Sequence, residues 1–234
     1  MNRWFTRYVC GVENDVEKDP RSWIVREGDR RNNPTAYEDY PHPGAQLVEL
    51  RPRKGGRGVG RLALGKRGTQ GNETLVDDVS KTGAELAQAG ESRHRLLYAT
   101  PTLKAPVHIS GTPKLKIRVA CSKPAANLSV WLVSLPWNKR ARRNINANLI
   151  TRGWADPQNH SSLTESSPLD PGKFYELTFT LQPDDQVIPE GQQIGLMIFS
   201  SDRDFTLWPE PGTKLMVDLD ATALHLPVVG GAEA

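Results

Sequence analysis

The second half of the chain alternates apolar and polar residues with a period of two, and this pattern restricts the fold more than any other feature. In the clearest case, Leu115, Ile117 and Val119 are separated by Lys116 and Arg118. Successive side chains of a strand point to opposite faces of its sheet, so this alternation predicts a strand with one buried face. The same pattern recurs over residues 176–181 and 214–219.

Two other runs, residues 127–135 and 194–199, are apolar almost throughout. Strands that are covered on both faces have this composition. Turn-forming residues separate the runs: Pro171-Gly172, Pro189-Glu190-Gly191 and Pro211-Gly212. The 234 residues include 20 glycines and 18 prolines, and only 37% are hydrophobic, which suits a protein with many turns. Many short strands without intervening helices predict an all-β fold, a jelly-roll β-sandwich.

The first half of the chain is less regular. Residues 1–9 place Met1, Trp4, Phe5, Tyr8 and Val9 on one helical face, and Gly11 follows as a stop signal. A helix this short needs a partner for its aromatic side chains. It could dock on the sandwich, but we favour the tail of a domain that lies upstream. Strands are expected over 23–26 and 46–50 and an exposed basic loop over 51–67, while 71–92 receives no assignment.

Composition excludes several classes of function. The net charge of +3 is too small to indicate nucleic-acid binding by itself. The two cysteines give no disulfide framework, and Cys121 continues the inward phase of a strand as a small buried hydrophobe. Neither a signal peptide nor an apolar run of membrane-spanning length is found. A soluble chain without nucleic-acid or membrane partners is expected, with a cytoplasmic location favoured and export left open if the chain is a fragment.

No motif assigns a catalytic, cofactor-binding or metal-binding residue. The stretch from Gly60 to Lys66 has the spacing of a nucleotide-binding loop, but Arg67 stands where Ser or Thr should bind magnesium. No Gly-x-Ser-x-Gly sequence exists, and Ser110, the nearest candidate nucleophile, lacks the leading glycine. The histidines at 42, 94, 108, 160 and 225 lack metal-ligand spacing, so surface or structural roles are favoured.

Three weaker signals have a plain structural interpretation that we favour. The acidic pairs Asp184-Asp185 and Asp202-x-Asp204 could bind calcium, but aspartate is also common in turns. The basic groups 139–143 and 51–67 could contact phosphates, but no aromatic residues are interleaved with them, which favours solvated loops. Trp154 and Trp208 are expected in loops, where they could stack on a sugar or pack against the core.

Several longer segments carry a family resemblance when taken together. In the second half they are 150–159 with Ser162-Leu163, 171–184, 188–196, 199–202 and 211–215, and upstream they are Leu97-Tyr98 and 109–113. These segments resemble the C-terminal domain of Xaa-Pro dipeptidyl-peptidases. Residues 3–12 resemble the last helix of the α/β-hydrolase domain in that family. The resemblance is strong over 95–230, good over 1–50 and weak over 51–94.

The resemblance implies a division of the chain and a parent activity. Residues 1–20 would be the tail of the hydrolase domain, 21–94 connecting strands and loops, and 95–234 a sandwich of the galactose-binding-domain-like kind. The catalytic Ser, Asp and His of the family precede this region, so the chain is expected to be inactive alone. The family releases N-terminal Xaa-Pro dipeptides by acyl-enzyme chemistry, and related acyl esterases of the cocaine esterase and glutaryl acylase type share its layout.

The expected partner is an α/β-hydrolase domain, either upstream in the same polypeptide or on a separate chain, and a homo-oligomer is a further expectation. The sandwich would shape the active site or support assembly. Two other functions are open to a chain of this composition. One is a freestanding carbohydrate-binding β-sandwich, and the other is a basic interaction module that uses residues 51–67.

Overall fold

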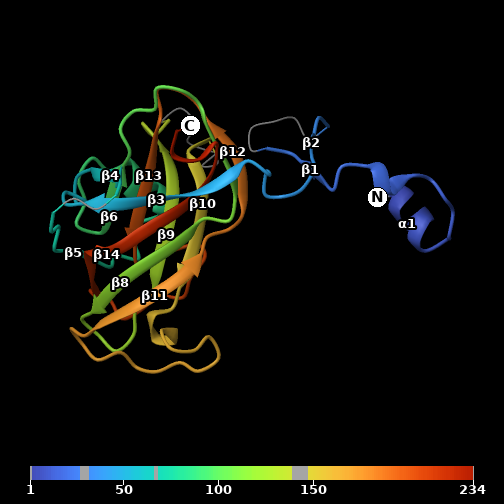
Figure 1. The fold of residues 1–234 in the computed structure, drawn as a ribbon. Helices are drawn as coiled ribbons and strands as arrows, with labels where there is room; N and C mark the ends of the chain where they lie inside the picture. The colour runs from blue at the N-terminus through green and yellow to red at the C-terminus, as the bar shows by residue number, and fades with distance from the viewer. Residues whose placement is uncertain (1, 27–31, 66–67, 139–146, 234) are drawn as a thin grey trace.

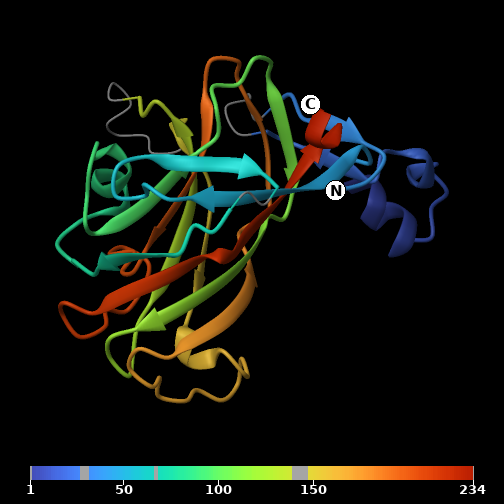
Figure 2. The same cartoon turned by 60° about the vertical axis from the view of Figure 1, so that its left-hand side comes forward.

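The computed structural model describes residues 2–26, 32–65, 68–138 and 147–233, and within these ranges twelve strands hydrogen-bond into one network. Figure 1 and Figure 2 show that the network folds into two facing layers, a β-sandwich, from which the N-terminal segment extends to one side. The strands are β3 (Ala45–Arg53), β4 (Gly60–Leu64), β5 (Asn72–Val76), β6 (Arg95–Ala99), β7 (Val107–Gly111), β8 (Lys114–Cys121), β9 (Leu128–Leu135), β10 (Leu149–Ala155), β11 (Phe174–Thr180), β12 (Asp184–Ile188), β13 (Gln193–Phe199) and β14 (Lys214–Val229).

Strand pairing explains how the layers close around one core. The strands follow the order β10-β9-β13-β6-β4-β3-β14-β7-β12, β8 lies between β14 and β11, and β5 pairs with β14. β4 joins the two layers, since it pairs with β6 in parallel and with β3 in antiparallel orientation. Apolar side chains from both layers meet in the main core cluster, which includes Ile117 of β8 and Leu132 of β9. Burial of such side chains is the main favourable contribution to folding.

The alternating strand is confirmed in position and in register. Residues 114–121 form β8, in which Leu115, Ile117 and Val119 are fully buried. Cys121 is buried as well, and this burial raises the pKa of its thiol to about 12. On the opposite face Lys116 pairs with Glu176 of β11 at 2.9 Å. The period of two therefore identified the core face of this strand correctly.

The apolar runs are confirmed as central strands with two covered faces. Every residue of β9 is buried, and β9 pairs with β10 on one side and β13 on the other. Its outer face carries Trp131, which packs with the short helix α2 (Gly83–Gln88) in a second apolar cluster. A Cβ atom on Gly83 would lie 2.4 Å from the Trp131 ring, so the close approach of α2 requires glycine here.

A buried arginine fastens this helix to the sheet. Arg95 of β6 is fully buried, and its guanidinium donates to the carbonyl oxygens of Gly56, Gly58, Leu86 and Ala89, among others. These acceptors belong to the turn between β3 and β4 and to α2 or the residue after it. Burial lowers the pKa of Arg95 to about 10, yet the group stays charged at neutral pH and is balanced by carbonyl dipoles.

Three sequence predictions about local structure were wrong. Residues 51–67 do not form one continuous loop. β3 continues to Arg53, and residues 60–64 form β4, in which Leu62 and Ala63 are buried. The many charged and glycine residues hid this second alternation. Asp184 and Asp185 lie on strand β12 instead of a turn, and Trp154 lies on β10 instead of a loop. In each case pairing with a neighbouring strand outweighs the weak local preference.

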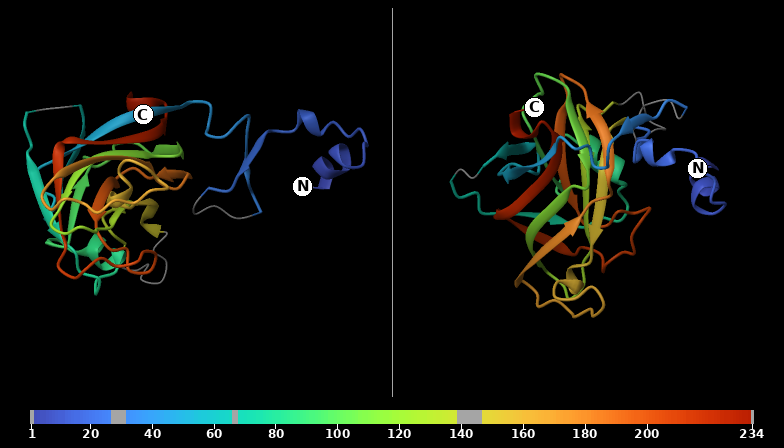
Figure 3. Two further views of the ribbon diagram at one scale, coloured as in Figure 1. Left: turned by 90° about the horizontal axis from the view of Figure 1, so that it is seen from below. Right: turned by 45° about the vertical axis from the view of Figure 1, so that its right-hand side comes forward.

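The N-terminal segment contains the expected helix, α1 (Asn2–Tyr8), followed by η1 (Val16–Lys18) and the two-stranded sheet of β1 (Ser22–Ile24) and β2 (Thr35–Tyr37). Arg3 pairs with Asp19, and Arg7 pairs with Glu17, so α1 folds back on its own segment. Figure 3 shows α1 separated from the sandwich in both views. Trp4, Phe5 and Tyr8 are each about half exposed, and α1 has no buried residue. Over the described ranges no helix has the length and apolarity needed to cross a membrane.

The orientation of β8 leads to a stability prediction. Ile117→Ala should lower the free energy of unfolding by about 2–5 kcal/mol, because it leaves a cavity in the closed core. Lys116→Ala should lower it by less than about 1 kcal/mol, since the Lys116–Glu176 pair is exposed. Urea unfolding monitored by tryptophan fluorescence measures both. Equal losses for the two variants would contradict the register of β8.

Candidate functional site

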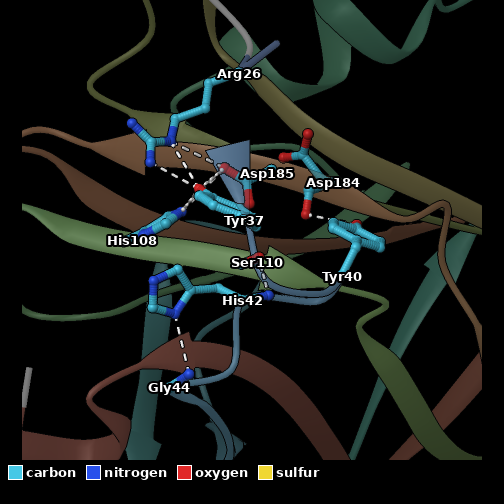
Figure 4. Close-up of polar contacts among 9 residues, drawn as sticks. All are labelled: Arg26, Tyr37, Tyr40, His42, Gly44, His108, Ser110, Asp184 and Asp185. Carbon is cyan, nitrogen blue, oxygen red and sulfur yellow. Dashed lines mark hydrogen bonds and ion pairs between the residues drawn. The ribbon is translucent and has the colours of Figure 1, made fainter. Parts of the chain in front are cut away.

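The described part of the chain has a cluster of buried and partly buried polar side chains where the N-terminal segment meets the sandwich. Figure 4 shows Arg26 and Tyr37, from the segment, converging with His108 of β7 on Asp185 of β12. We call these four residues the junction cluster. Their side chains come from three parts of the chain, since His108 lies 71 residues after Tyr37 and Asp185 lies 77 residues after His108. The cluster therefore exists only in the folded protein.

A single carboxylate oxygen organises the junction cluster. Oδ1 of Asp185 accepts a hydrogen bond from Arg26 Nε at 3.1 Å and another from the Tyr37 hydroxyl at 3.1 Å. Nε2 of His108 lies 3.0 Å from the same oxygen. The Asp185 side chain is only 4% exposed, and its other oxygen, Oδ2, is buried without a protein partner among the described residues. A carboxylate this deeply buried is stable only while its donors stay in place.

Strand register explains how the sandwich presents its half of the cluster. In the antiparallel pair of β7 and β12, Ser110 lies opposite Asp185 and His108 lies opposite Val187. His108 and Asp185 are therefore diagonal neighbours on one face of the sheet, within reach of each other. In the other half, Tyr37 is the last residue of β2 and Arg26 lies two residues after the end of β1.

The electrostatics of the cluster favour a charged arginine and a neutral tyrosine. The hydrogen bond from Arg26 to the Tyr37 hydroxyl, with smaller contributions from Asp185, raises the pKa of Arg26 above its usual value. Burial raises the pKa of Tyr37, so its phenol stays protonated and donates to Asp185. The Arg26 guanidinium also lies 5.6 Å from the centre of the Tyr37 ring, a cation–π contact.

Residues just beyond β2 extend the contact with the sandwich. The Tyr40 hydroxyl donates to the backbone carbonyl of Asp184 at 3.1 Å, and the backbone N–H of His42 donates to Oγ of Ser110 at 2.9 Å. The His42 ring packs edge-on against the rings of Tyr37 and His108. Seven residues after Tyr37, Gly44 leads directly into β3. The segment is thus held along the edge formed by β7 and β12.

The contacts of Ser110 differ from those of an activated serine nucleophile. Ser110 is fully buried and accepts from a backbone N–H. His108 contacts the Asp185 carboxylate, but the Ser110 hydroxyl is bonded to the backbone of His42 and not to the His108 ring, so in the described residues these three side chains do not form the chain of contacts that activates a nucleophile. No group of three or more His, Cys, Asp or Glu side chains that could hold a metal ion is found in the described residues.

Most of the other residues singled out in the sequence make no contact with the junction cluster, and two of them, Trp154 and Asp202, meet each other. Residues 60–64 are strand β4, where a Cβ on Gly60 would lie 2.6 Å from the Tyr98 ring, and Lys66 and Arg67 lie outside the described residues, as do Lys139–Arg143. Asp202 is buried and accepts from the indole N–H groups of Trp131 and Trp154, and burial raises its pKa. Trp208 is exposed in a loop. His94 and His160 each contact a backbone carbonyl.

Sequence reasoning missed Arg26, Tyr37 and Asp185 as members of one site. Asp185 had been interpreted as a turn residue, and His108 as a surface or structural histidine. None of the four carries a local motif, because each contributes one polar group to a contact made across the fold. No local pattern marks Asp185, because β12 reads Asp-Asp-Gln-Val-Ile and Val187, two residues further along the strand, is exposed.

Removing the organising carboxylate should free the N-terminal segment. Asp185→Ala leaves Arg26, Tyr37 and His108 without their shared acceptor, so we expect a loss of roughly 1–3 kcal/mol in stability. It should also accelerate tryptic cleavage after Arg26, measured by mass spectrometry. Asp39→Ala is the matched control, because Asp39 forms only an exposed 3.4 Å pair with Arg21. Unchanged melting and cleavage in the Asp185 variant would show that the cluster does not hold the segment.

Comparison with known proteins gives the family. The model of the X-Pro dipeptidyl-peptidase C-terminal non-catalytic domain matches residues 14–234. A protein of Rhodopirellula baltica, provisionally named an Xaa-Pro dipeptidyl-peptidase, is 60% identical over 99% of this chain and 37% of its own length. The Xaa-Pro dipeptidyl-peptidase of Lactobacillus delbrueckii subsp. lactis is 28% identical over 97% of the chain and 33% of its length.

A solved structure agrees with this assignment at the level of the fold. An α-amino acid ester hydrolase superposes with a TM-score of 0.70 at 18% identity, over 96% of this chain and 43% of that protein. The chain thus spans well under half the length of each of these relatives. On the family match to nearly its whole length, this chain belongs to the family of X-Pro dipeptidyl-peptidase C-terminal non-catalytic domains.

Proposed function

We propose that this chain works as the accessory half of a serine hydrolase, held against an α/β-hydrolase domain that carries the catalytic residues. The observation that carries the proposal is the aromatic face of α1, formed by Trp4, Phe5 and Tyr8, which the described residues leave about half exposed. Aromatic faces of this kind mark protein interfaces. The relatives, of which the chain spans only about a third, support a hydrolase domain as the partner.

The junction cluster gives this docking face a defined position. The path from α1 to β3 passes through the small sheet of β1 and β2, and this sheet is anchored where Arg26 and Tyr37 meet Asp185. A linker that is fixed to one domain restricts the orientation of the two domains relative to each other, whereas a flexible linker does not. We infer that the junction cluster sets the orientation of the sandwich relative to the hydrolase domain, and so the shape of the cleft between them.

The names of the relatives support peptides with proline in the second position as the substrate class of the parent enzyme. An ester is the second candidate substrate, because the fold is similar to that of an α-amino acid ester hydrolase. The carbohydrate-binding alternative gains no support. Trp154 stacks on Phe205 at 5.7 Å between ring centres and donates to Asp202, so much of its surface is already used.

The chain by itself should not hydrolyse peptides. It offers no activated nucleophile in its described residues, and acyl-enzyme chemistry requires one. The test is release of the chromophore from a Gly-Pro anilide by the purified chain, with a serine-directed phosphonate as the control. Turnover that the phosphonate abolishes would reveal a nucleophile in this chain and contradict an accessory role. Reading the coding sequence upstream of Met1 would show whether a Gly-x-Ser-x-Gly motif precedes it in the same frame.

The aromatic face of α1 should make the isolated chain self-associate. Deleting residues 1–19 should leave the melting temperature nearly unchanged, because α1 buries no residue on the sandwich. The deletion should reduce both self-association in analytical ultracentrifugation and binding of a hydrophobic dye. Trp4→Ser with Phe5→Ser tests the same face without shortening the chain. Leu163→Ser is the control, since Leu163 is 91% exposed and lies outside the N-terminal segment.

Two outcomes would count against the proposed interface. If the deletion unfolds the protein, the segment is part of the core of this domain and not a surface for a partner. If the deletion and the Leu163→Ser control reduce self-association equally, the aromatic face has no special role.

A further inference from the structure

A slot in the sandwich opens along one edge of β4. Its volume is about 490 Å³, and its lining includes every residue from Arg61 to Leu64 on one side and from Thr100 to Lys104 on the other. Consecutive residues of a strand point to opposite faces of the sheet, so only an opening along the edge of β4 touches all four of its residues. The slot is therefore a gap where β4 and the chain after β6 part.

The backbone edge of β4 lacks a partner strand in this slot. β4 pairs with β6 only at Gly60 and Arg61, and no other strand of the described residues pairs with β4 on that side. Thr100, the first residue after β6, donates its N–H to the carbonyl oxygen of Ile194 on β13 instead. Beyond Arg61, β4 thus presents an open edge to the slot.

The register of β3 and β4 indicates which backbone groups this edge presents. Leu62 lies opposite Pro52, which has no N–H to donate, so these two residues do not exchange hydrogen bonds. Bonded and non-bonded pairs alternate along an antiparallel ladder, so Leu50 and Leu64 form a non-bonded pair as well. The N–H and C=O groups of Leu62 and Leu64 therefore point away from β3, toward β6 and the slot. An open edge is a template for pairing with another strand.

The floor of the slot is apolar. It consists of inward side chains that belong to the main core cluster, including Val48, Leu50, Val107, Ile194 and Val228. Alternate side chains of a strand added to β4 would point onto this floor. Folded domains bind extended peptides in this way, through main-chain hydrogen bonds at an open edge and pockets for alternate side chains.

The slot also lies next to the anchorage of the N-terminal segment. β4, drawn in cyan, runs toward the side of the sandwich from which this segment extends (Figure 2). Val107, which lines the slot, directly precedes His108 of the junction cluster on β7. At the end of the segment, the carbonyl oxygen of Gly44 accepts a hydrogen bond from Gly230, the neighbour of Gly231 in the slot lining. The slot is thus continuous with the interface proposed above.

We propose that the slot binds an extended segment of the hydrolase domain, which adds one strand to β4. The segment donates an N–H to the carbonyl oxygen of Leu62, accepts from the N–H of Leu64, and places valine- or leucine-sized side chains on the apolar floor. This inference rests on the accessory function proposed above and names a second contact with the same partner. The chain matches only 37% of the Rhodopirellula baltica relative, so the rest of such a protein is long enough to supply the segment.

A fluorescein-labelled peptide with the sequence Ser-Val-Thr-Val-Ser tests the slot by fluorescence polarisation with the full 234-residue chain. The peptide should bind, and replacing both valines with serine should weaken binding at least about ten-fold, because the apolar contact with the floor is lost. Methyl groups on alternate backbone nitrogens test the strand pairing. Methylation of the set that faces β4 should abolish binding, whereas methylation of the other set should change it little.

Variants of the edge test the same contact from the side of the protein. Leu64→Pro removes the N–H that faces the slot, so it should weaken binding at least about ten-fold. Leu64→Thr is the matched control, because it changes the same exposed side chain but keeps the N–H. Thr102→Trp, at an exposed position that lines the slot, should fill it and block binding. Unchanged melting temperatures show that the variants remain folded.

The source of the segment is tested with overlapping peptides that cover the Rhodopirellula baltica protein outside the matched region. One run of overlapping peptides should bind and displace the labelled probe. If none of them binds while the probe does, the occupant is not a segment of the hydrolase domain. If self-association is abolished by Leu64→Pro but not by Trp4→Ser with Phe5→Ser, a second copy of the chain occupies the slot instead.

Other results would overturn strand addition itself. Failure of the probe to bind, equal loss from the two methylated sets, or full binding by Leu64→Pro would each show that the edge of β4 does not pair with a peptide. None of these results bears on the docking face of α1, because no residue of α1 lines the slot. The tests of the accessory function through residues 1–19 would therefore stand or fall separately.

Discussion

The sandwich depends on β14, because the backbone of this one strand satisfies the hydrogen bonds of four others. Its first part pairs with β5, its last part pairs with β3 and β7, and β8 pairs with both parts. A shift in register between Asp218 and Ala223 allows the strand to bend between these partners. A buried backbone group without a partner is costly, so loss of this strand would expose the edges of both layers. The apolar residues of β14 also supply part of the main core, including Leu215, Val217 and Leu224.

Around this frame the molecule divides into a sandwich with its own closed core and an N-terminal segment with an exposed aromatic face. The sandwich closes its own core and even buries a charged group, Arg95, by surrounding it with carbonyl oxygens. The N-terminal segment instead leaves its aromatic side chains in contact with water and is anchored through polar contacts at Asp185. A closed core beside an exposed aromatic face is what the interface proposed above predicts.

Patterns within a few residues predicted much of the fold. The alternation that ends in Cys121, the apolar run of β9 and the helix at the N-terminus were all visible in the sequence. The stretch from 51 to 67 was not, because its glycines and basic residues dilute the apolar positions of β3 and β4, and only pairing with other strands shows which residues face inward. Trp154 and Asp185 were placed outside strands for the same reason. Short strands draw most of their stability from their neighbours and little from their own residues.

The sequence by itself determined the class of fold, the inward face of the regular strands and, through segments that resemble a known family, the membership of that family. Only the tertiary structure decided which polar residues meet. Asp185 acquires its role from Arg26 and His108, which are 159 and 77 residues away, and Arg53 faces Arg61 because of the register of two strands. The apolar–polar periodicity predicts whether a side chain points toward the core, because that direction depends only on the position of the residue in its own strand. Contacts between polar groups depend on how the strands are arranged, and that arrangement is a property of the whole chain.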